Sequence, residues 1–273
     1  MMRIAFQGER GAYSEQAIFK HFGEECEAVP CHELEDVFRR VVRGEVDAGV
    51  VPIENSLAGS INKTYDLFLD HDLKIIGEIY LRIHHSLLGN RDSSLAGIRH
   101  VYSHPQALAQ CEDFLRKLGV EPHPTYDTAG AAKWVRESGR RDAAAIASVI
   151  AAQEYGLVVL VEGVETLENN ATRFLVISQE VSPVREECKT SIVFETRDLP
   201  AALYKCLGGF ATNGVNLTKL ESRPIRGENW KYLFYLDFDG HLDDPPVNRA
   251  LEELAYFTVT LKVLSSYPKG DEV

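Results

Sequence analysis

Residues 169–177 read NNATRFLVI, and this stretch places polar side chains directly before an apolar strand. The run from Phe174 to Ile177 has the unbroken apolar composition of a buried strand. Thr172 brings a hydroxyl that donates hydrogen bonds, and Arg173 brings a forked cation that suits carboxylates. Polar groups at strand ends are where α/β folds bind ligands, so we expect a site here. The alternative is an ordinary strand threonine beside a surface ion pair.

Strands and helices alternate on the N-terminal side of this stretch. Apolar residues between Glu33 and Arg43 recur at helical spacing, and short apolar runs such as 3–6 and 98–102 lie between such helices. This order, from residue 3 to residue 178, predicts an α/β architecture with mainly parallel sheets. Because the polar strand ends come from distant parts of the chain, we expect two lobes around a central cleft.

The C-terminal part has a different order of elements. A polar stretch at 178–187, with one proline, predicts a linker. The elements expected beyond it are strand 190–195, helix 200–212, strands 215–221 and 232–239, helix 246–257 and strand 258–265. This βαββαβ order is the ferredoxin-like motif. We therefore expect domains at 1–180 and 188–268, and the exposed sheet edge of the second favours a homodimer or homotetramer.

Composition excludes several classes of partner. The 273 residues carry a net charge of -12, so we expect neither nucleic acid nor an anionic membrane as a partner. Five cysteines without a Cys-x-x-Cys pair, and no signal or long apolar stretch, indicate a cytoplasmic protein with reduced thiols. Cys31-His32 has no second His/Cys pair at ligand spacing, so we expect no metal site.

Other predicted strand ends also carry polar groups. The first strand runs into a turn with Gly8 and Gly11, after which we expect Ser14 to cap a helix, a corner that attracts anions. A second strand ends in the polar stretch 53–56, and His85 stands at the end of another. Each could equally be a tight turn or a structural hydrogen-bonding residue.

Five short motifs occur in order across nearly the whole chain. They are Gly8-x-x-Gly11-x-Tyr13-Ser14, Val51-Pro52-Ile53-Glu54-Asn55-Ser56 with Gly59, Ser103-His104-Pro105-Gln106-Ala107-Leu108, Asn170-x-Thr172-Arg173-Phe174 and Glu221-Ser222-Arg223-Pro224. Together they resemble the prephenate dehydratase family. The resemblance implies a two-lobed catalytic domain like a periplasmic binding protein, followed by a ferredoxin-like ACT domain that binds phenylalanine. Because a strand begins at Arg3, we expect no preceding chorismate mutase domain.

The resemblance also implies an activity and a site. Prephenate would lose water and carbon dioxide to give phenylpyruvate in phenylalanine biosynthesis, and because aromatisation drives this step, no cofactor is needed. Thr172 would donate to the leaving hydroxyl, with Glu54 as proton carrier and Asn55 as a further catalytic residue. The substrate-binding residues would be Arg173, Phe174, Ser14, Ser56, His85 and Gln110.

The phenylalanine site would lie in the C-terminal domain. The residues implied for it are Ala202, Leu203, Asn213, Gly214, Asn216, Leu217, Glu221, Ser222, Arg223 and Pro224. One residue departs from the family pattern, because Ala201 stands where the family often has glycine. An arogenate dehydratase and a non-catalytic sensor of an aromatic metabolite remain alternative functions.

Overall fold

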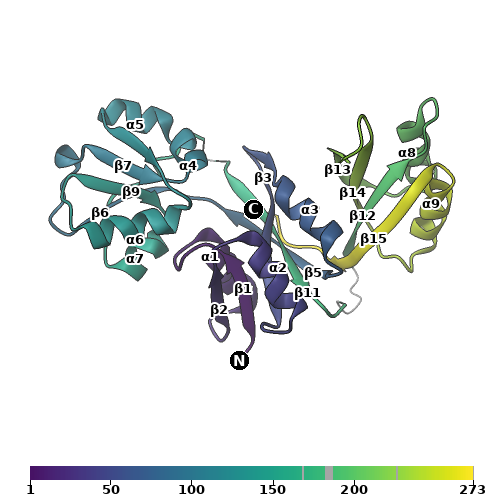
Figure 1. Ribbon diagram of the computed structural model, residues 1–273, viewed down its shortest axis with the longest axis horizontal. Helices are drawn as coiled ribbons and strands as arrows, with labels where there is room; N and C mark the ends of the chain where they lie inside the picture. The colour runs from purple at the N-terminus through teal and green to yellow at the C-terminus, as the bar shows by residue number, and fades with distance from the viewer. Residues whose placement is uncertain (168, 182–186, 226, 273) are drawn as a thin grey trace. The chain divides into compact units, whose positions relative to one another are not determined.

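The computed structural model describes residues 1–273 except 168, 182–186, 226 and 273 (Figure 1). The chain divides into two compact units, and each is described by itself. Unit 1 contains Met1–Asp70 and Ile79–Leu175, and unit 2 contains His71–Glu78 and Val176–Asp271. The domain limits expected at 180 and 188 remain predictions, and residues 182–186 of the expected linker lie outside the described residues.

The first sheet of unit 1 has the strand order β2-β1-β3-β11-β5, with β4 paired to β3. Its strands are β1 (Arg3–Gln7), β2 (Glu27–Cys31), β3 (Ala48–Asn55), β4 (Gly59–Ser60), β5 (Lys74–Arg82) and β11 (Ala171–Ser178), and its helices are α1 (Tyr13–Phe22), α2 (Leu34–Val42) and α3 (Asn62–Asp70). Strand β1 is parallel to both β2 and β3. Most of the apolar face predicted for α2 is buried, since Leu34, Val37, Phe38 and Val41 are each at most 2% exposed, whereas Val42, at the last position of the helix, is 45% exposed.

The second sheet of unit 1 has the order β10-β6-β9-β7-β8. Its strands are β6 (Ser86–Gly89), β7 (His100–Ser103), β8 (Glu121–Pro124), β9 (Ala143–Ala147) and β10 (Val158–Glu162), and its helices are η1 (Leu95–Gly97), α4 (Pro105–Gln110), α5 (Glu112–Leu118), α6 (Thr128–Ser138) and α7 (Val149–Tyr155). Helices α6 and α7 cover one face and α4 and α5 the other (Figure 1). The sheet is mixed, because β6 is antiparallel to β9 and β10. Hydrophobic periodicity carries no information on strand direction, so the expected mainly parallel sheet was only partly right.

Unit 2 contains the predicted ferredoxin-like βαββαβ fold. Its elements are β12 (Cys188–Thr196), α8 (Ala202–Thr212), β13 (Leu217–Pro224), β14 (Tyr232–Asp239), α9 (Pro245–Ala255) and β15 (Thr258–Pro268). The sheet order is β13-β14-β12-β15, and these neighbours are antiparallel. Phe210 of α8 and Leu254 of α9 join Phe194 and Phe238 of the sheet in one core, so both helices cover the same face.

Unit 2 also includes a segment from the first third of the sequence. The first half of β5 ends at Glu78, whose carboxylate oxygens lie 2.8 and 3.1 Å from the ammonium of Lys189 on β12. The N–H of Gly270 donates to the same carboxylate at 3.2 Å. The side chains of Lys189 and Glu78 are only 6% and 1% exposed. Removing one partner of such a buried pair leaves a charge that is costly to bury.

Helix termini place the loops of unit 1. Asp127 and Ser148 cap α6 and α7 as predicted, since their side chains accept from the N–H groups of Gly130 and Ala151. The cap predicted at Ser14 is wrong, because α1 begins at Tyr13 and Ala12 occupies the N-cap without a side-chain hydrogen bond. The Ser14 hydroxyl is therefore two positions past the N-cap, too late to cap the first free N–H groups.

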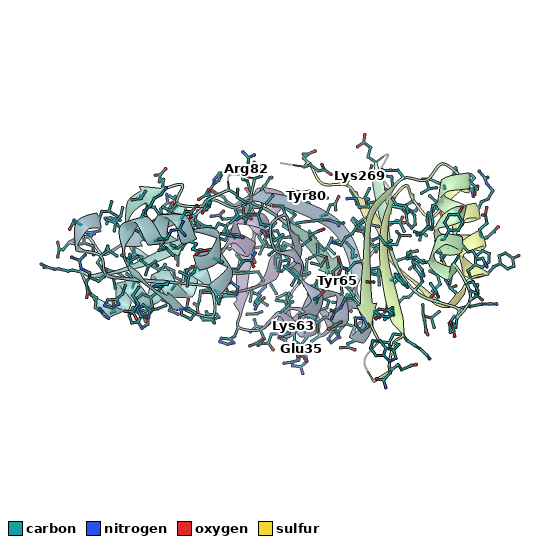
Figure 2. The ribbon with its side chains drawn as sticks, turned by 90° about the horizontal axis from the view of Figure 1, so that it is seen from above. Glu35, Lys63, Tyr65, Tyr80, Arg82 and Lys269 are labelled. Atoms are coloured by element: carbon teal, nitrogen blue, oxygen red, sulfur yellow. The ribbon has the colours of Figure 1, made fainter. Side chains whose placement is uncertain are left out.

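The turn before α1 and the far end of that helix are both held by tertiary contacts. Gly11 has a φ of 83°, and a Cβ there would lie 2.7 Å from the Cα of Ala151, so this position requires glycine. At the other end of α1, the Lys20 ammonium donates to the carbonyl of Tyr80 at 2.6 Å. Tyr80 and Arg82 lie along the part of β5 that belongs to unit 1 (Figure 2). Among the described residues, no helix is long and apolar enough to span a bilayer.

Candidate functional site

A cavity of about 230 Å³ lies in unit 1 and collects residues from both of its sheets. Its walls come from strand ends and helix N-termini. The lining residues are Gln7, Gly8, Ala12, Tyr13, Ser14, Pro52, Asn55, Ile83, His85, His104, Gln106, Ala107, Gln110, Tyr126, Asp127, Thr128 and Thr172. Five of the nine catalytic and substrate-binding residues expected from the sequence are in this set, namely Thr172, Asn55, Ser14, His85 and Gln110.

The other four expected residues are not among the lining residues. Arg173 and Phe174 follow Thr172 on β11 and are 6% and 2% exposed. Arg173 points to the opposite face of the strand from Thr172, because side chains alternate along β structure. Glu54 pairs with Ser60 in the β3–β4 ladder. The Ser56 hydroxyl donates to the Asn169 carbonyl at 2.8 Å and accepts from the Ala171 N–H at 2.9 Å, so it holds the loop before β11.

Asn55 orients the hydroxyl of Thr172. The Asn55 Oδ1 accepts from the backbone N–H groups of Leu57 at 3.1 Å and Ala58 at 3.0 Å. These two donors fix the orientation of the side-chain amide, because they require an oxygen on their side and so place the nitrogen on the other. The Asn55 Nδ2 therefore donates to Thr172 Oγ1 at 3.0 Å. Because this bond uses a lone pair of the hydroxyl oxygen, the hydroxyl hydrogen of Thr172 is left for a molecule in the cavity.

The same amide fixes a chain of side chains that ends at His85. Asn55 Nδ2 also donates to Asn170 Oδ1 at 2.8 Å, so Asn170 presents its Nδ2 to Gln110 Oε1 at 2.9 Å. Gln110 Oε1 is thus an acceptor, and it lies 2.9 Å from His85 Nε2. The Nε2 atom must therefore carry a proton, and the neutral tautomer of His85 has its lone pair on Nδ1.

Tyr13 completes this chain at the cavity wall. Its hydroxyl oxygen lies 2.8 Å from His85 Nδ1 and 2.6 Å from the His84 carbonyl oxygen, two hydrogen-bond acceptors that share its single hydrogen. Burial lowers the pKa of His85, although its bond to Gln110 acts in the opposite direction. Burial also raises the pKa of Tyr13 well above its ordinary value. Both groups are therefore neutral near pH 7, and Tyr13 is a hydrogen-bond donor.

The cavity contains the positive end of a helix but no Lys or Arg side chain. None of the lining residues is Lys or Arg. The first residues of α1, Tyr13 and Ser14, line it, and their backbone N–H groups precede the first intrahelical hydrogen bonds. Such a helix start carries a partial positive charge, and here no side chain caps it. The arrangement suits an anion, as the turn between Gly8 and Ser14 led us to expect.

Two titratable side chains line the opposite wall. The Asp127 carboxylate accepts from the N–H of Glu9 at 3.0 Å, and burial raises the pKa of Asp127. His104 accepts from the N–H of Gln106 at Nδ1, and burial lowers the pKa of His104. The neutral His104 ring therefore carries its proton on Nε2.

Several residues of this site had no role assigned from the sequence, although Gln106 was expected among the polar strand ends at the cleft. Gln106 donates to Asn55 Oδ1 at 3.2 Å, and Asn170 links Asn55 to Gln110. Tyr13 and Asp127 line the cavity. Tyr13, Gln106 and Asn170 all stand inside the motifs quoted above, so their motif membership was the available signal. Asp127 was identified from the sequence only as a helix cap, and that role does not indicate that the residue also lines the cavity.

The residues expected to bind phenylalanine lie in unit 2, on α8, on β13 and in the turn between them. Asn213 links the two helices, because its Nδ2 donates to Glu253 at 3.0 Å and its Oδ1 accepts from Arg249 at 2.9 Å. Ala201, at the N-cap of α8, has a φ of 57° and a ψ of 32°, a left-handed conformation. This backbone explains why a glycine is the ordinary residue for such a position.

Comparisons with known proteins agree on one family. The family model described as prephenate dehydratase matches residues 4–182. The chain is 45% identical to arogenate dehydratase/prephenate dehydratase 2 of Arabidopsis thaliana, over 98% of this chain and 73% of that protein. Two solved structures each have a TM-score of 0.89. One is GqqA, described as a novel type of quorum-quenching acylase, which is 38% identical over 98% of both chains. The other is prephenate dehydratase of Arthrobacter aurescens in complex with L-Phe, 32% identical over 98% of this chain and 90% of that one.

Proposed function

We propose that this chain, which belongs to the prephenate dehydratase family, converts prephenate to phenylpyruvate with loss of water and carbon dioxide in phenylalanine biosynthesis. The observation that supports this most directly is the Thr172 hydroxyl, which is oriented by Asn55 at 3.0 Å in a cavity that suits an anion. Prephenate carries two carboxylates and a ring hydroxyl. Its conversion needs the carboxylates held in place and the departing oxygen hydrogen-bonded.

The cavity residues divide these tasks. The N–H groups of Tyr13 and Ser14 at the start of α1 bind a substrate carboxylate, with the Ser14 hydroxyl beside them. Thr172 donates to the ring hydroxyl as its carbon–oxygen bond breaks, and the oxygen leaves as water after taking up one proton from solvent. The ring carboxylate leaves as carbon dioxide, and its bonding electrons complete the aromatic ring. The buried Arg173 holds the strand that carries Thr172.

The activity is tested by incubating the purified protein with prephenate and, separately, with arogenate. Formation of phenylpyruvate from prephenate is the expected result. Turnover of arogenate alone would show that the protein is an arogenate dehydratase. Thr172→Ala should lower kcat by roughly 10² to 10⁴ with a much smaller change in KM, the usual scale for a positioned acid or donor. Thr172→Ser should keep part of the activity. Absence of turnover with both substrates would favour the sensor alternative.

We further propose that L-phenylalanine inhibits the enzyme through the ferredoxin-like fold of unit 2, in a homodimer or homotetramer. The turn after α8 and the edge strand β13 carry the residues that resemble the family's amino-acid site. Inhibition then reflects a coupling of about 1 to 3 kcal/mol between two arrangements of the oligomer. Arg223→Ala should weaken inhibition and leave the uninhibited rate within a few-fold. If this variant and the wild type are inhibited equally, Arg223 is not part of the phenylalanine site.

A cytoplasmic location is part of the same proposal. All five cysteines are buried and none forms a disulfide. Thiol titration of the unfolded protein, taken from a whole-cell lysate without reductant, should therefore count five free thiols. A lower count would place the protein in an oxidising compartment.

A further inference from the structure

Two histidines and a glutamate meet on the edge of the second sheet of unit 1. In the parallel pair of β7 and β8, His100 is in register with Glu121, and His123 lies two residues further along β8 on the same face. One ligand atom from each of the three residues lies within 4.8 Å of the others. The side chains of His100 and His123 are about one-third exposed and that of Glu121 is largely exposed. None of the three lines the cavity described above.

The spacing of the three donor atoms matches a four-coordinate metal site. His100 Nδ1 lies 3.0 Å from His123 Nε2 and 3.4 Å from Glu121 Oε2, and His123 Nε2 lies 3.7 Å from that oxygen. Nitrogen and oxygen ligands bind Zn²⁺ at about 2.0 to 2.2 Å, so neighbouring ligands of a tetrahedral ion are roughly 3.3 to 3.6 Å apart. The three distances bracket this range, and small rotations of the side chains would bring all three donors to bonding distance.

The surroundings orient both rings. His123 stacks on Tyr102, with ring centroids 4.7 Å apart and planes inclined by 18°. The other nitrogen of His100, Nε2, lies 4.0 Å from Asp142 Oδ2. Two hydrogen bonds from Arg140, at 2.9 and 2.8 Å, hold that carboxylate and contribute to a pKa of about 2 for Asp142. At 4.0 Å this carboxylate is too far for a direct hydrogen bond, but its charge favours a proton on His100 Nε2 and so leaves Nδ1 for a metal.

The β8 strand, which carries two of the three residues, is an edge strand with two prolines. It reads Glu-Pro-His-Pro, so Pro122 and Pro124 have no N–H group to donate. The flanking bonds, Glu121 N–H to the Arg99 carbonyl and Thr125 N–H to the Ser103 carbonyl, are both 2.8 Å long. Because N–H groups alternate sides along a strand, Pro122 and Pro124 stand where an N–H would point away from β7, at the open edge of the sheet.

We propose that His100, Glu121 and His123 bind one divalent transition-metal ion, best matched by Zn²⁺, with water as the fourth ligand. The ion connects the edge strand β8 to β7 through their side chains. Imidazole and carboxylate ligands of this kind also accept Co²⁺, Ni²⁺ and Cu²⁺. This site was not expected from the sequence, because His100 and His123 are 23 residues apart and neither belongs to a metal motif.

The test uses the full-length protein, stripped with a chelator, and Zn²⁺ as the probe. Isothermal titration should give one ion per chain, and Co²⁺ in its place should show the visible bands of four-coordinate cobalt. His123→Gln and Glu121→Gln should each weaken binding at least roughly tenfold, whereas His21→Gln, which removes an exposed histidine on α1, should leave it unchanged. Zn²⁺ should also slow amide hydrogen exchange at residues 120–125.

Two results would overturn the proposal. One is equal stoichiometry and affinity in the wild type and both ligand variants, which would place the ion elsewhere. The other is the absence of any Zn²⁺ binding by a folded wild-type chain. In that case the two rings would form a simple hydrogen bond with Glu121 as its neighbour. Glu121→Gln keeps the proposal testable even if His123→Gln fails to fold, because the Glu121 side chain is 66% exposed.

Discussion

Replacing Asn55 with aspartate should reverse the direction of the hydrogen bond that orients Thr172. The Asn55 Oδ1 keeps its two backbone donors in the variant, but the atom 3.0 Å from Thr172 Oγ1 changes from a donor to an acceptor. The Thr172 hydroxyl then donates to the new carboxylate instead of the departing oxygen. A hydrogen bond to a charged group is worth about 1.5 to 3 kcal/mol, and each 1.36 kcal/mol is about tenfold in rate. We therefore expect kcat to fall roughly 10- to 100-fold.

A double-mutant cycle separates this effect from simple charge repulsion of a dianionic substrate. If Asn55→Asp acts through the Thr172 hydroxyl, it should cost almost nothing further in a Thr172→Ala background. Repulsion would lower the rate equally in both backgrounds, and equal losses of kcat at saturating prephenate would refute our account. Asn90→Asp is the matched control, since the Asn90 Nδ2 donates to two carbonyls at 2.9 Å outside the cavity. It should reduce stability and leave kcat unchanged.

Three further predictions concern protonation and backbone strain. Gln110→Glu puts a carboxylate 2.9 Å from His85 Nε2 and should raise the pKa of His85 by about 1 to 3 units. An unchanged His85 pKa in an NMR titration of the imidazole would contradict the hydrogen bond from His85 Nε2 to Gln110. Burial lowers the pKa of His85 and His104, so the unfolded chain binds their protons first. Their contribution to the free energy of unfolding is therefore complete above about pH 6.5 and is lost as the pH falls below it. Urea unfolding at pH 7.5 and at pH 5.5 should show that His104→Gln loses less stability between these two pH values than the wild type does. Ala201→Gly relieves the left-handed backbone at the start of α8 and should raise the urea midpoint by the equivalent of roughly 0.5 to 1 kcal/mol, whereas a lower midpoint would show that the alanine is not strained.

Local sequence signals predicted the frame of the molecule well. Asp127 and Ser148 were identified as helix caps because capping depends on residues within one turn. The βαββαβ order followed from periodicity and turn residues in the same way. Ser14 was misplaced by two positions at a helix start, where a single hydroxyl cannot define the first helical residue.

The contacts of the site could not be read from the sequence, because they join distant residues. Asn55 meets Asn170 and Thr172 across 115 and 117 positions, and His85 meets Tyr13 across 72. The direction of each amide follows from what lies on its far side, which only the folded chain defines. The sequence alone does predict the orientation of Arg173. Adjacent strand residues face opposite sides, so if Thr172 lines the cavity, Arg173 points away from it.

The buried pair of Glu78 and Lys189 limits how this protein can be divided or recombined. Unit 2 is assembled from two separate stretches, His71–Glu78 and Val176–Asp271, so a single cut after the first 180 residues does not release it intact. Such a cut would leave Glu78, which is 2% exposed, without its cation, and leave the Ile75 N–H without its bond to Ser265. An exchange of regulatory parts between relatives must therefore carry both stretches together, and recombination within this family is expected to favour crossovers that keep Glu78 and Lys189 from the same parent.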